Sequence, residues 1–539
     1  MAAPISFANH DACAVALSDR ALHAYETALA SEYVLKDEAA QSRADPYAFR
    51  DPQHHRPAAV VLPASVEELQ AVLAVAREHR TPLWTVSTGK NLGYGGAAPR
   101  VAGSVVVDLQ RMNRILEVNE ELGYAVVEPG VRFLDLYAHL QQQGHKLMMS
   151  VPDIGWGSLI GNALERGFGY APMWDHSASA CGMEVMLADG RLLRTGMGAK
   201  TGSSAWHVYK GGFGPSLDGL LMQSNLGIVT RMGVWLMPRP ETIVTCMLKA
   251  PRVSDLGPLI DGLRPLLLDG TIQSNAVIGN TTVIASMMSE RKAWWGGDGA
   301  MPEPAVQAAA QGLHLGRWNA RFGLYGHASM TEARLAVVQA ALAHIEGAEW
   351  AVRRYPGDVA AADAHPADHA QLGIPGLALL RMAAWRGGTP AHTDFSLVCP
   401  ATAADAERQR TLIQTEVEAH GFDYAGGFTL SGRHAIALAL LSFDQADAAQ
   451  AQQVHHLFSR LIDRASAAGE APYRAHLALM DQISAQYDFN EHALRDVVET
   501  IKNALDPQGI LSPGKQGLWP GRPGLAARSS TPTQTKEAE

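Results

Sequence analysis

Residues 87–100, STGKNLGYGGAAPR, decide how this chain is interpreted. Around the single tyrosine of the stretch, Tyr94, stand four glycines: Gly89, Gly93, Gly95 and Gly96. Such a run disfavours a helix and allows several backbone N–H groups to point at one anion. It therefore predicts a loop that binds a phosphate-bearing cofactor, with Tyr94 facing the compound that the cofactor converts. Taken alone, the motif is equally compatible with a glycine-rich surface turn.

Residues 93–98 also match the G-x-G-x-x-A pattern of dinucleotide-binding folds. In those folds the pattern opens a helix. Here Pro99 follows, and then a further apolar strand at 104–109. The loop is therefore expected to bind phosphate in a different fold.

Length and composition narrow the class of protein. A chain of 539 residues is too long for one ordinary core, so two domains are expected. The hydrophobic share of 47% and charged share of 18% are typical of a globular protein, and the net charge of −10 argues against a nucleic-acid partner. No apolar run approaches the roughly 20 residues of a membrane span, so no membrane partner is expected.

Cysteine usage and the first residues predict a cytoplasmic protein. The four cysteines, Cys13, Cys181, Cys246 and Cys399, are far apart and form no CxxC pair, which indicates free thiols. The opening residues MAAPISFANHDAC lack the basic and apolar regions of a signal peptide. No histidine or cysteine spacing suggests a metal site, and neither HExxH, GxSxG nor a Walker A lysine is present.

The order of predicted elements indicates an α+β protein. Ser65 and Glu68 form a capping box that starts a helix over 66–80. Short strands and a helix follow, at 83–86, 104–109, 115–118, 125–127 and 133–143. Pro238 and Pro240 mark a domain boundary, after which alanine-rich helices, such as 403–420 and 448–467, alternate with strands.

Four further positions indicate a functional site only when they are considered together. Asp153 stands in a Pro-Asp-x-Gly turn, and His392 is one of 21 histidines. Arg474 follows Tyr473 before a helix, and Lys515 stands in a Pro-Gly-Lys loop. Each residue by itself is better explained by turn chemistry, packing or a solvated charge.

In their order along the chain, six segments resemble the vanillyl-alcohol oxidase / p-cresol methylhydroxylase family of flavoproteins. The resemblance spans about residues 58–520, and its segments are 87–100, 151–170, 181–199, 223–238, 473–483 and 506–520. It implies a two-domain α+β fold in which a FAD-binding domain (1–240 and 471–524) is covered by a cap domain (241–470), followed by a disordered tail (525–539). It also implies a homodimer or a larger homo-oligomer.

The resemblance also assigns residues to the cofactor. The implied FAD-binding residues are Ser87, Gly89, Asn91, Gly93, Gly95, Gly96, Ser158, Glu165, Gly167, Ile228, Val229 and Lys515. The oxidase branch of the family attaches FAD to a histidine, and the methylhydroxylase branch to a tyrosine. His392 lies at the matching distance before Tyr473, and no tyrosine occurs between Tyr355 and Tyr424. A histidyl–FAD bond at His392 is therefore expected.

The implied reaction is the oxidation of para-substituted phenols such as vanillyl alcohol or eugenol. A phenol has a pKa of about 10, so a cation and hydrogen bonds are needed to favour the phenolate. By resemblance, Tyr94, Tyr473 and Arg474 form that phenolate clamp. Hydride passes from the benzylic carbon to flavin N5, and water addition to the p-quinone methide, or proton loss from it, gives the product. Asp153 matches the family's acid or base near N5, and Tyr170 a second pocket aromatic.

One departure bears on specificity. The oxidase branch continues after its histidine with hydrophobic and aromatic residues, whereas this chain reads Thr393-Asp394-Phe395. Asp394 is expected to line the substrate pocket and to make it more polar. Residues 428–440 also differ from the family pattern.

Dioxygen is the expected electron acceptor. A dehydrogenase that delivers electrons to a cytochrome c is the first alternative, and His392, Asp153 and the absent export signal argue against it. An FAD-linked hydroxy-acid oxidoreductase would leave the Tyr94, Tyr473 and Arg474 set unexplained. If the protein were a flavin-binding carrier without activity, the three residues of that set would have no common function.

Overall fold

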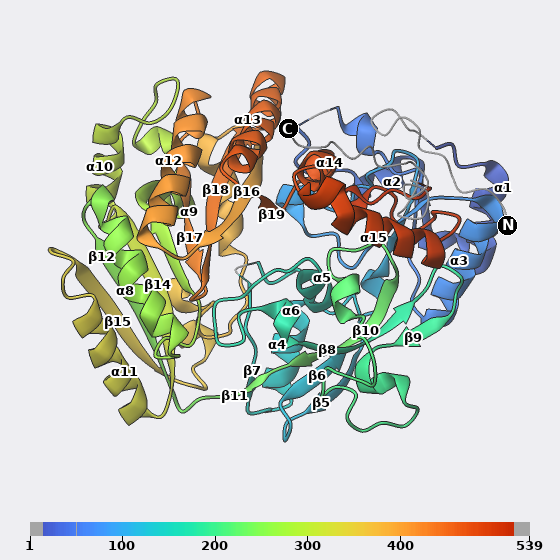
Figure 1. The fold of residues 1–539 in the computed structure, drawn as a ribbon, viewed down its shortest axis with the longest axis horizontal. Coiled ribbons are helices and arrows are strands. Elements are labelled where there is room, and N and C mark those ends of the chain that lie inside the picture. Colours follow the sequence, from blue (N-terminus) through green and yellow to red (C-terminus); the bar gives the residue numbers. More distant parts are fainter. Residues whose placement is uncertain (1–14, 50, 153, 522–539) are drawn as a thin grey trace, which may run out of the picture.

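The computed structural model describes residues 15–49, 51–152 and 154–521 and has two halves. Figure 1 shows the blue start of the chain and its red end together in one half, while the green-to-orange middle forms the other. Both halves combine helices with sheets, so the predicted α+β class is confirmed. Cys13 and residues 525–539 lie outside the described residues, and the three described cysteines are free.

The half that contains both chain ends is built on two main sheets. In the first, three parallel strands carry one antiparallel edge strand in the order β1-β2-β4-β3, with bounds β1 (Val34–Lys36), β2 (Ala59–Val61), β3 (Leu83–Val86) and β4 (Val105–Asp108). The second is antiparallel in the order β5-β6-β10-β8-β9, with bounds β5 (Ile115–Asn119), β6 (Tyr124–Val127), β8 (Ala180–Met186), β9 (Leu192–Arg194) and β10 (Ile228–Trp235). A short pair, β7 (Leu147–Met148) and β11 (Met237–Pro238), lies where the chain leaves this half.

Helices cover these sheets, and the two predicted over 66–80 and 133–143 are among them. They are α1 (Asp19–Leu29), α2 (Asp37–Ala40), α3 (Val66–His79), α4 (Phe133–Gln142), α5 (Leu159–Leu164), α6 (His176–Ser179), α7 (Asp218–Leu221), α14 (Met480–Ser484) and α15 (Phe489–Leu505). The predicted capping box exists, because the Ser65 hydroxyl accepts from the Glu68 N–H and the Glu68 carboxylate accepts from the Ala64 N–H. Leu69, Val72, Leu73 and Ala76 of α3 are fully buried.

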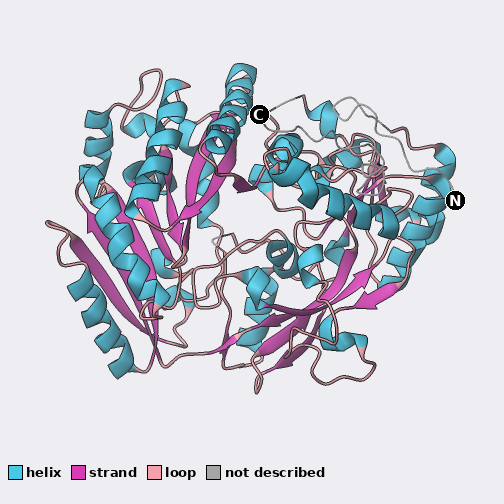
Figure 2. Ribbon diagram, viewed as in Figure 1, coloured by secondary structure: helices cyan, strands magenta, loops and turns pink. Residues whose placement is uncertain are grey.

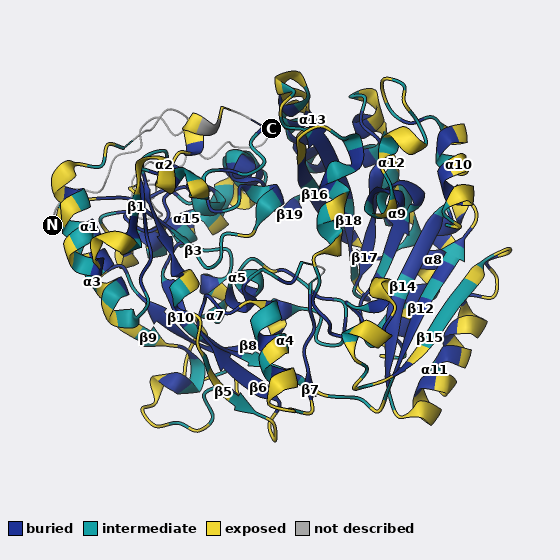
Figure 3. Ribbon diagram, turned by 180° about the vertical axis from the view of Figure 1, so that it is seen from behind, coloured by how far each residue is buried: buried dark blue, intermediate teal, exposed yellow. Residues whose placement is uncertain are grey.

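The middle of the chain forms one antiparallel sheet of eight strands in the order β15-β12-β14-β13-β17-β18-β16-β19. The bounds are β12 (Thr242–Ala250), β13 (Ala276–Asn280), β14 (Trp318–Gly326), β15 (Glu349–Pro356), β16 (Pro390–Pro400), β17 (Ala425–Leu430), β18 (His434–Asp444) and β19 (Pro472–Arg474). Figure 3 shows most of these strands in the dark blue of buried residues, whereas the helix at the rim, α11, is largely exposed. The edge strand β19 brings Tyr473 and Arg474 beside β16.

Four helices pack against one face of this large sheet and form the main core. Their bounds are α8 (Leu256–Leu268), α11 (Ala328–Ala341), α12 (Ala403–Ala419) and α13 (Ala448–Ala467), and α9 (Thr281–Met288) and α10 (Glu303–Gly312) complete this half. From β16, Ala391, Phe395 and Leu397 point into that core. Successive strand residues face opposite sides, so His392, Asp394 and Ser396 face away from the four helices.

The return segment after β19 is joined to the first sheet. Leu83 donates its N–H to the Ile510 carbonyl, and Ser512 donates to the Leu83 carbonyl, so residues 510–512 continue beside β3. The buried Lys502 ammonium holds this junction by donating to Asp506 and to the Asn225 and Leu511 carbonyls. Lys515 thereby comes to lie next to the loop that follows β3. Within the described residues, no helix combines the length and apolar character needed to cross a bilayer.

Candidate active site

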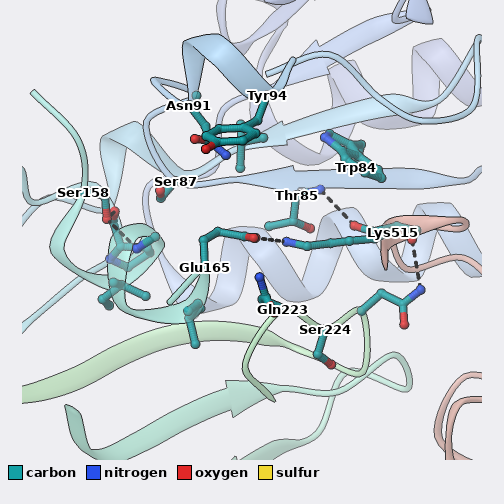
Figure 4. A pocket seen from close by; sticks show the side chains of 18 of the residues that line it. Trp84, Thr85, Ser87, Asn91, Tyr94, Ser158, Glu165, Gln223, Ser224 and Lys515 are labelled. Atoms are coloured by element: carbon teal, nitrogen blue, oxygen red, sulfur yellow. Dashed lines mark hydrogen bonds and ion pairs between the residues drawn. The ribbon is translucent and has the colours of Figure 1, made fainter. Parts of the chain in front are cut away.

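A cleft separates the glycine loop from the return segment and from the turn after β7 (Figure 4). Many residues predicted to bind the cofactor line it: Ser87, Gly89, Asn91, Gly96, Ser158, Glu165, Ile228, Val229 and Lys515. Tyr94 and Arg474 line it as well. Gly93, Gly95, Gly167 and His392 are not among its lining residues.

The glycine loop keeps the backbone that its composition predicts. It follows β3 and forms a single 3₁₀ turn, Leu92–Tyr94, in place of the helix that a dinucleotide fingerprint would open. Gly89, Gly95 and Gly96 have φ of 63°, 103° and 58°, which side chains rarely adopt. A Cβ on Gly95 would lie 1.9 Å from the Leu477 Cδ2. Gly95 therefore permits close packing of the return segment behind the loop.

A second close approach shapes the opposite wall. Ser158 caps α5 by accepting from the Gly161 N–H at 3.1 Å, and its hydroxyl donates to the Pro129 carbonyl at 2.6 Å. A Cβ on Gly161 would lie 2.3 Å from the Ser87 Oγ, so only glycine allows α5 to touch the loop. Gly167, in contrast, packs against Asn162 and away from the cleft lining.

An ion pair crosses the cleft between Glu165 and Lys515 (Figure 4). The two side chains are 22% and 19% exposed, and the Gln516 amide adds a longer bond of 3.4 Å to the same carboxylate. Burial opposes ionisation of Glu165, but the Lys515 ammonium and, farther away, Arg474 hold its pKa below the usual value. The pair fixes the return segment to the wall that carries α5.

The three residues predicted to form a phenolate clamp are brought together. The Arg474 guanidinium lies 4.5 Å from the centre of the Tyr94 ring and 5.9 Å from that of Tyr473. Its Nη2 donates to the Asn91 Oδ1 at 3.0 Å, a contact between residues 383 positions apart. Gln223 supports the cluster by donating to the Tyr473 carbonyl at 2.8 Å.

Electrostatics keep this cluster positively charged. Burial acts against the charge of Arg474, yet Tyr94, Tyr473 and Glu165 hold its pKa above the usual value. Loss of water around the Tyr94 hydroxyl raises the pKa of that group, although Arg474 acts in the opposite direction. Tyr94 therefore stays a protonated phenol at neutral pH and can donate a hydrogen bond.

Strand β16 faces the glycine loop from the other half of the molecule. Its Ser396 hydroxyl lies 3.2 Å from the Tyr94 hydroxyl, and Thr393 donates to the Gly93 carbonyl at 2.8 Å. A Cβ on Gly93 would lie 3.0 Å from Asp394 Oδ2 and 3.2 Å from His392 Nε2. Gly93 is thus needed for contact between the loop and the strand, which the sequence did not reveal.

His392 and Asp394 are neighbours on that face. The His392 Nε2 lies 3.5 Å from the Asp394 Oδ2, with side chains 9% and 26% exposed. The Tyr47 ring packs against His392 with ring centres 5.1 Å apart. Burial raises the pKa of Asp394, against the opposing charges of His392 and Arg474. Tyr47 was not predicted, because it lies in the loop-like part of residues 1–55, between the turn signals Asp45-Pro46 and Asp51-Pro52, where no motif marks it.

Tyr170 and Asp153 complete the predicted site residues, and Tyr170 is not among the residues that line the cleft. Tyr170 packs under Arg321 of β14, whose guanidinium lies 5.0 Å from the ring centre, and beside Phe168. Asn275, the residue before β13, donates to the neighbouring Gly169 carbonyl at 2.9 Å, so this segment contacts both halves. Asp153 lies outside the described residues.

The cleft residues fit a bound flavin nucleotide. Two residues that line the cleft have a buried polar atom with no hydrogen-bond partner among the described residues: Thr85 Oγ1 and Asn225 Oδ1. Buried polar atoms in native proteins are normally paired, so they point to a polar ligand. Asn225 belongs to the segment 223–238, and Thr85 lies just before the segment 87–100. Only the fold brings the two residues into one cleft.

Comparisons with known proteins identify both the fold and the cofactor. The family described as "FAD binding domain" matches residues 57–196, and that described as "FAD linked oxidases, C-terminal domain" matches residues 336–516. The flavoprotein subunit of 4-cresol dehydrogenase (hydroxylating) from Pseudomonas putida is 33% identical over 470 residues, which cover 86% of this chain and 88% of that protein.

Two solved structures resemble the whole chain. The 4-ethylphenol oxidase from Gulosibacter chungangensis, in complex with isoeugenol, has a TM-score of 0.89 and 36% identity and covers 95% of this chain and 99% of its own. The p-cresol methylhydroxylase with bound substrate has a TM-score of 0.87 and 31% identity, and covers 93% and 96%. Both levels of identity are high enough to indicate common ancestry as well as a common fold.

Proposed function

This chain belongs to the vanillyl-alcohol oxidase / p-cresol methylhydroxylase family of FAD-linked oxidoreductases, and we propose that it oxidises para-substituted phenols at the carbon attached to the ring. The observation that carries this proposal is the cluster of Arg474, Tyr94 and Tyr473 beside the cleft. The relatives support it, since their names include 4-cresol dehydrogenase and 4-ethylphenol oxidase.

The cluster favours the phenolate form of the substrate. A free phenol has a pKa of about 10, so ionisation near neutral pH requires a cation and hydrogen-bond donors at its oxygen. Arg474 supplies the cation, and Tyr94 and Tyr473 supply hydroxyl donors. A phenolate releases hydride from its benzylic carbon far more readily than a phenol, because the oxygen lone pair can move into the ring. This preorganised charge is the main contribution of the protein to the reaction.

The cofactor is proposed to lie in the cleft between the glycine loop and α5. Backbone N–H groups of residues 87–98 hold its phosphates, while Ser158, Glu165, Ile228, Val229 and Lys515 line its path, and His392 bonds to it covalently. When bound, FAD supplies the acceptor for the hydride. Asp153 then acts as acid or base at the benzylic position, and Tyr170 closes the pocket around the substituent.

Dioxygen is proposed as the electron acceptor, because a histidine stands where the methylhydroxylase branch has its flavin-bearing tyrosine. The 4-ethylphenol oxidase likeness at 36% identity agrees with this choice. A dehydrogenase that passes electrons to a cytochrome c is the second candidate, favoured by the 4-cresol dehydrogenase relative.

An anaerobic titration tests the proposal directly. Vanillyl alcohol, eugenol or 4-ethylphenol is added to the purified holoprotein while the flavin absorbance is followed, and air is then admitted. Bleaching and rapid recovery in air are expected. Bleaching that persists in air would establish phenol oxidation with a different acceptor.

The methyl ether of 4-ethylphenol is the matched control substrate. It has the same ring and side chain but cannot form a phenolate, so no bleaching is expected. Bleaching by the ether, or none by any of the three phenols, would contradict the proposed role of the cluster.

A further inference from the structure

Strand β16 places a carboxylate next to the histidine proposed to carry the cofactor. His392 and Asp394 project from the same face, with 3.5 Å between Nε2 and Oδ2. Both atoms face the Cα of Gly93, where a Cβ would come within 3.2 Å of each. Tyr47 packs against the His392 ring and restricts its movement. The two groups are therefore held next to each other behind Gly93 of the glycine loop.

We propose that Asp394 is the base that removes the Nε2 proton of His392 while that nitrogen forms the covalent bond to FAD. The inference rests on the proposed function, since it takes FAD as the cofactor and His392 as the attachment point. It gives Asp394 a role in maturation of the enzyme. A role in lining the substrate pocket does not explain Asp394, because its negative charge would repel a phenolate bound nearby.

The two ring nitrogens of His392 have different surroundings. Nδ1 is buried and finds no hydrogen-bond partner in the described part of the chain, whereas Nε2 faces the Asp394 carboxylate. A neutral imidazole next to a carboxylate places its proton on the nitrogen that faces it. Nε2 in that tautomer has no free lone pair, so it can bond to carbon only as its proton leaves. Asp394 is the acceptor within reach.

Attachment needs only FAD and His392 for bond formation, and dioxygen is required afterwards to reoxidise the flavin. A C–H bond of the flavin 8-methyl group and the Nε2–H bond break, and a C–N bond forms between the methyl carbon and Nε2. The electron pair of the C–H bond remains in the flavin, which takes up two protons, one of them passed on from Asp394. The flavin is thereby reduced by two electrons, and dioxygen, which becomes hydrogen peroxide, restores the oxidised form.

The surroundings of Asp394 give this step a pH dependence. The charged and titratable groups that face it are His392, Arg474, Tyr47 and Tyr94. Burial raises the pKa of Asp394 above its usual value, although His392 and Arg474 oppose the shift. The carboxylate accepts a proton only above that pKa, so attachment becomes slower as the pH falls through it.

The experiment measures covalent attachment directly. Apoprotein is prepared from riboflavin-starved cells and incubated with FAD, and the covalent fraction is followed over time by flavin fluorescence in denaturing gels and by intact mass. Asp394→Asn is compared with wild type, and His392→Ala gives the zero level. Ser442→Ala is the matched control, because Ser442 pairs directly with His392 across β16 and β18 but donates to the Met382 carbonyl.

We expect Asp394→Asn to bind FAD yet to attach it about 100-fold more slowly, whereas Ser442→Ala matches wild type. Attachment in wild type is expected to slow at acid pH, and this second measurement applies even if the variant does not fold. Equal rates in Asp394→Asn and wild type, or a flat pH profile in wild type, would overturn the proposal. A wild type without covalent flavin overturns it as well, whereas the anaerobic titration decides phenol oxidation independently.

Discussion

The glycine loop and strand β16 face each other across the same site, but they fix their side chains by different means. The loop depends on positions that only glycine can occupy without strain. Gly89, Gly95 and Gly96 have positive φ, and Gly95 packs closely against Leu477. Strand β16 is held by a continuous register with β18, from Pro390 opposite Asp444 to Pro400 opposite His434. Substitutions in the loop are therefore expected to act through the backbone, and those in the strand through single side-chain contacts.

The cations of the site differ in how they are paired. Lys515 of the return segment forms an ion pair with Glu165, whereas Arg474, on β19 beside β16, donates to the neutral Asn91 side chain. The β16 side contributes Asp394 next to His392. Arg474 is the cation that lies against the Tyr94 ring, and removing it should have the largest effect.

Replacing Arg474 by alanine is expected to lower kcat/KM for 4-ethylphenol by about 100-fold or more, as loss of a preorganised transition-state donor does. The effect should be smaller for Arg474→Lys, which keeps the charge but not the planar guanidinium that bonds Asn91. Steady-state kinetics and the FAD content of each variant are the measurements. Unchanged turnover in Arg474→Ala would remove the clamp from the mechanism.

Gly95→Ala is expected to destabilise the protein by about 2–4 kcal/mol, because it adds an overpacked contact to an unfavourable φ. Gly202→Ala is the matched control, since Gly202 has φ of 76° but no atom within 4 Å of a Cβ. That control should lose only about 1 kcal/mol. Denaturant unfolding of both variants gives the difference, and similar losses would show that the contact with Leu477 is not tight.

The sequence predicted local structure better than the contacts between distant segments. Ser65 and Glu68 form their capping box, and α13 has the predicted bounds, because both depend on neighbouring residues. The gathering of Tyr94, Tyr473 and Arg474 was inferred only from resemblance to a family. The bond between Arg474 and Asn91 crosses 383 positions, and no local pattern encodes it.

Two further features were not predicted from the sequence, because they also depend on contacts between residues that are far apart in the chain. Tyr47 packs on His392 although it comes from a loop-like stretch in which no motif marks it. Gly93 was predicted only as a cofactor-binding residue, and its contact with the side chains of His392 and Asp394 was not foreseen. Glycine composition predicts a close approach without identifying the partner, since the missing side chain leaves room for a ligand or for another strand equally well.

The smallest effect is expected for Ser396→Ala, which tests what β16 adds to the clamp. Its hydroxyl lies 3.2 Å from that of Tyr94, and a neutral hydrogen bond contributes about 0.5–1.5 kcal/mol, so kcat/KM should fall by about 2- to 12-fold. Ser442→Ala, on the adjacent strand, should leave kcat/KM unchanged. A decrease near that of Arg474→Ala would mean that β16 also orients Tyr94 in the transition state, and the contrast between the two sides of the site would then be wrong. No decrease would assign the whole clamp to the glycine loop and β19.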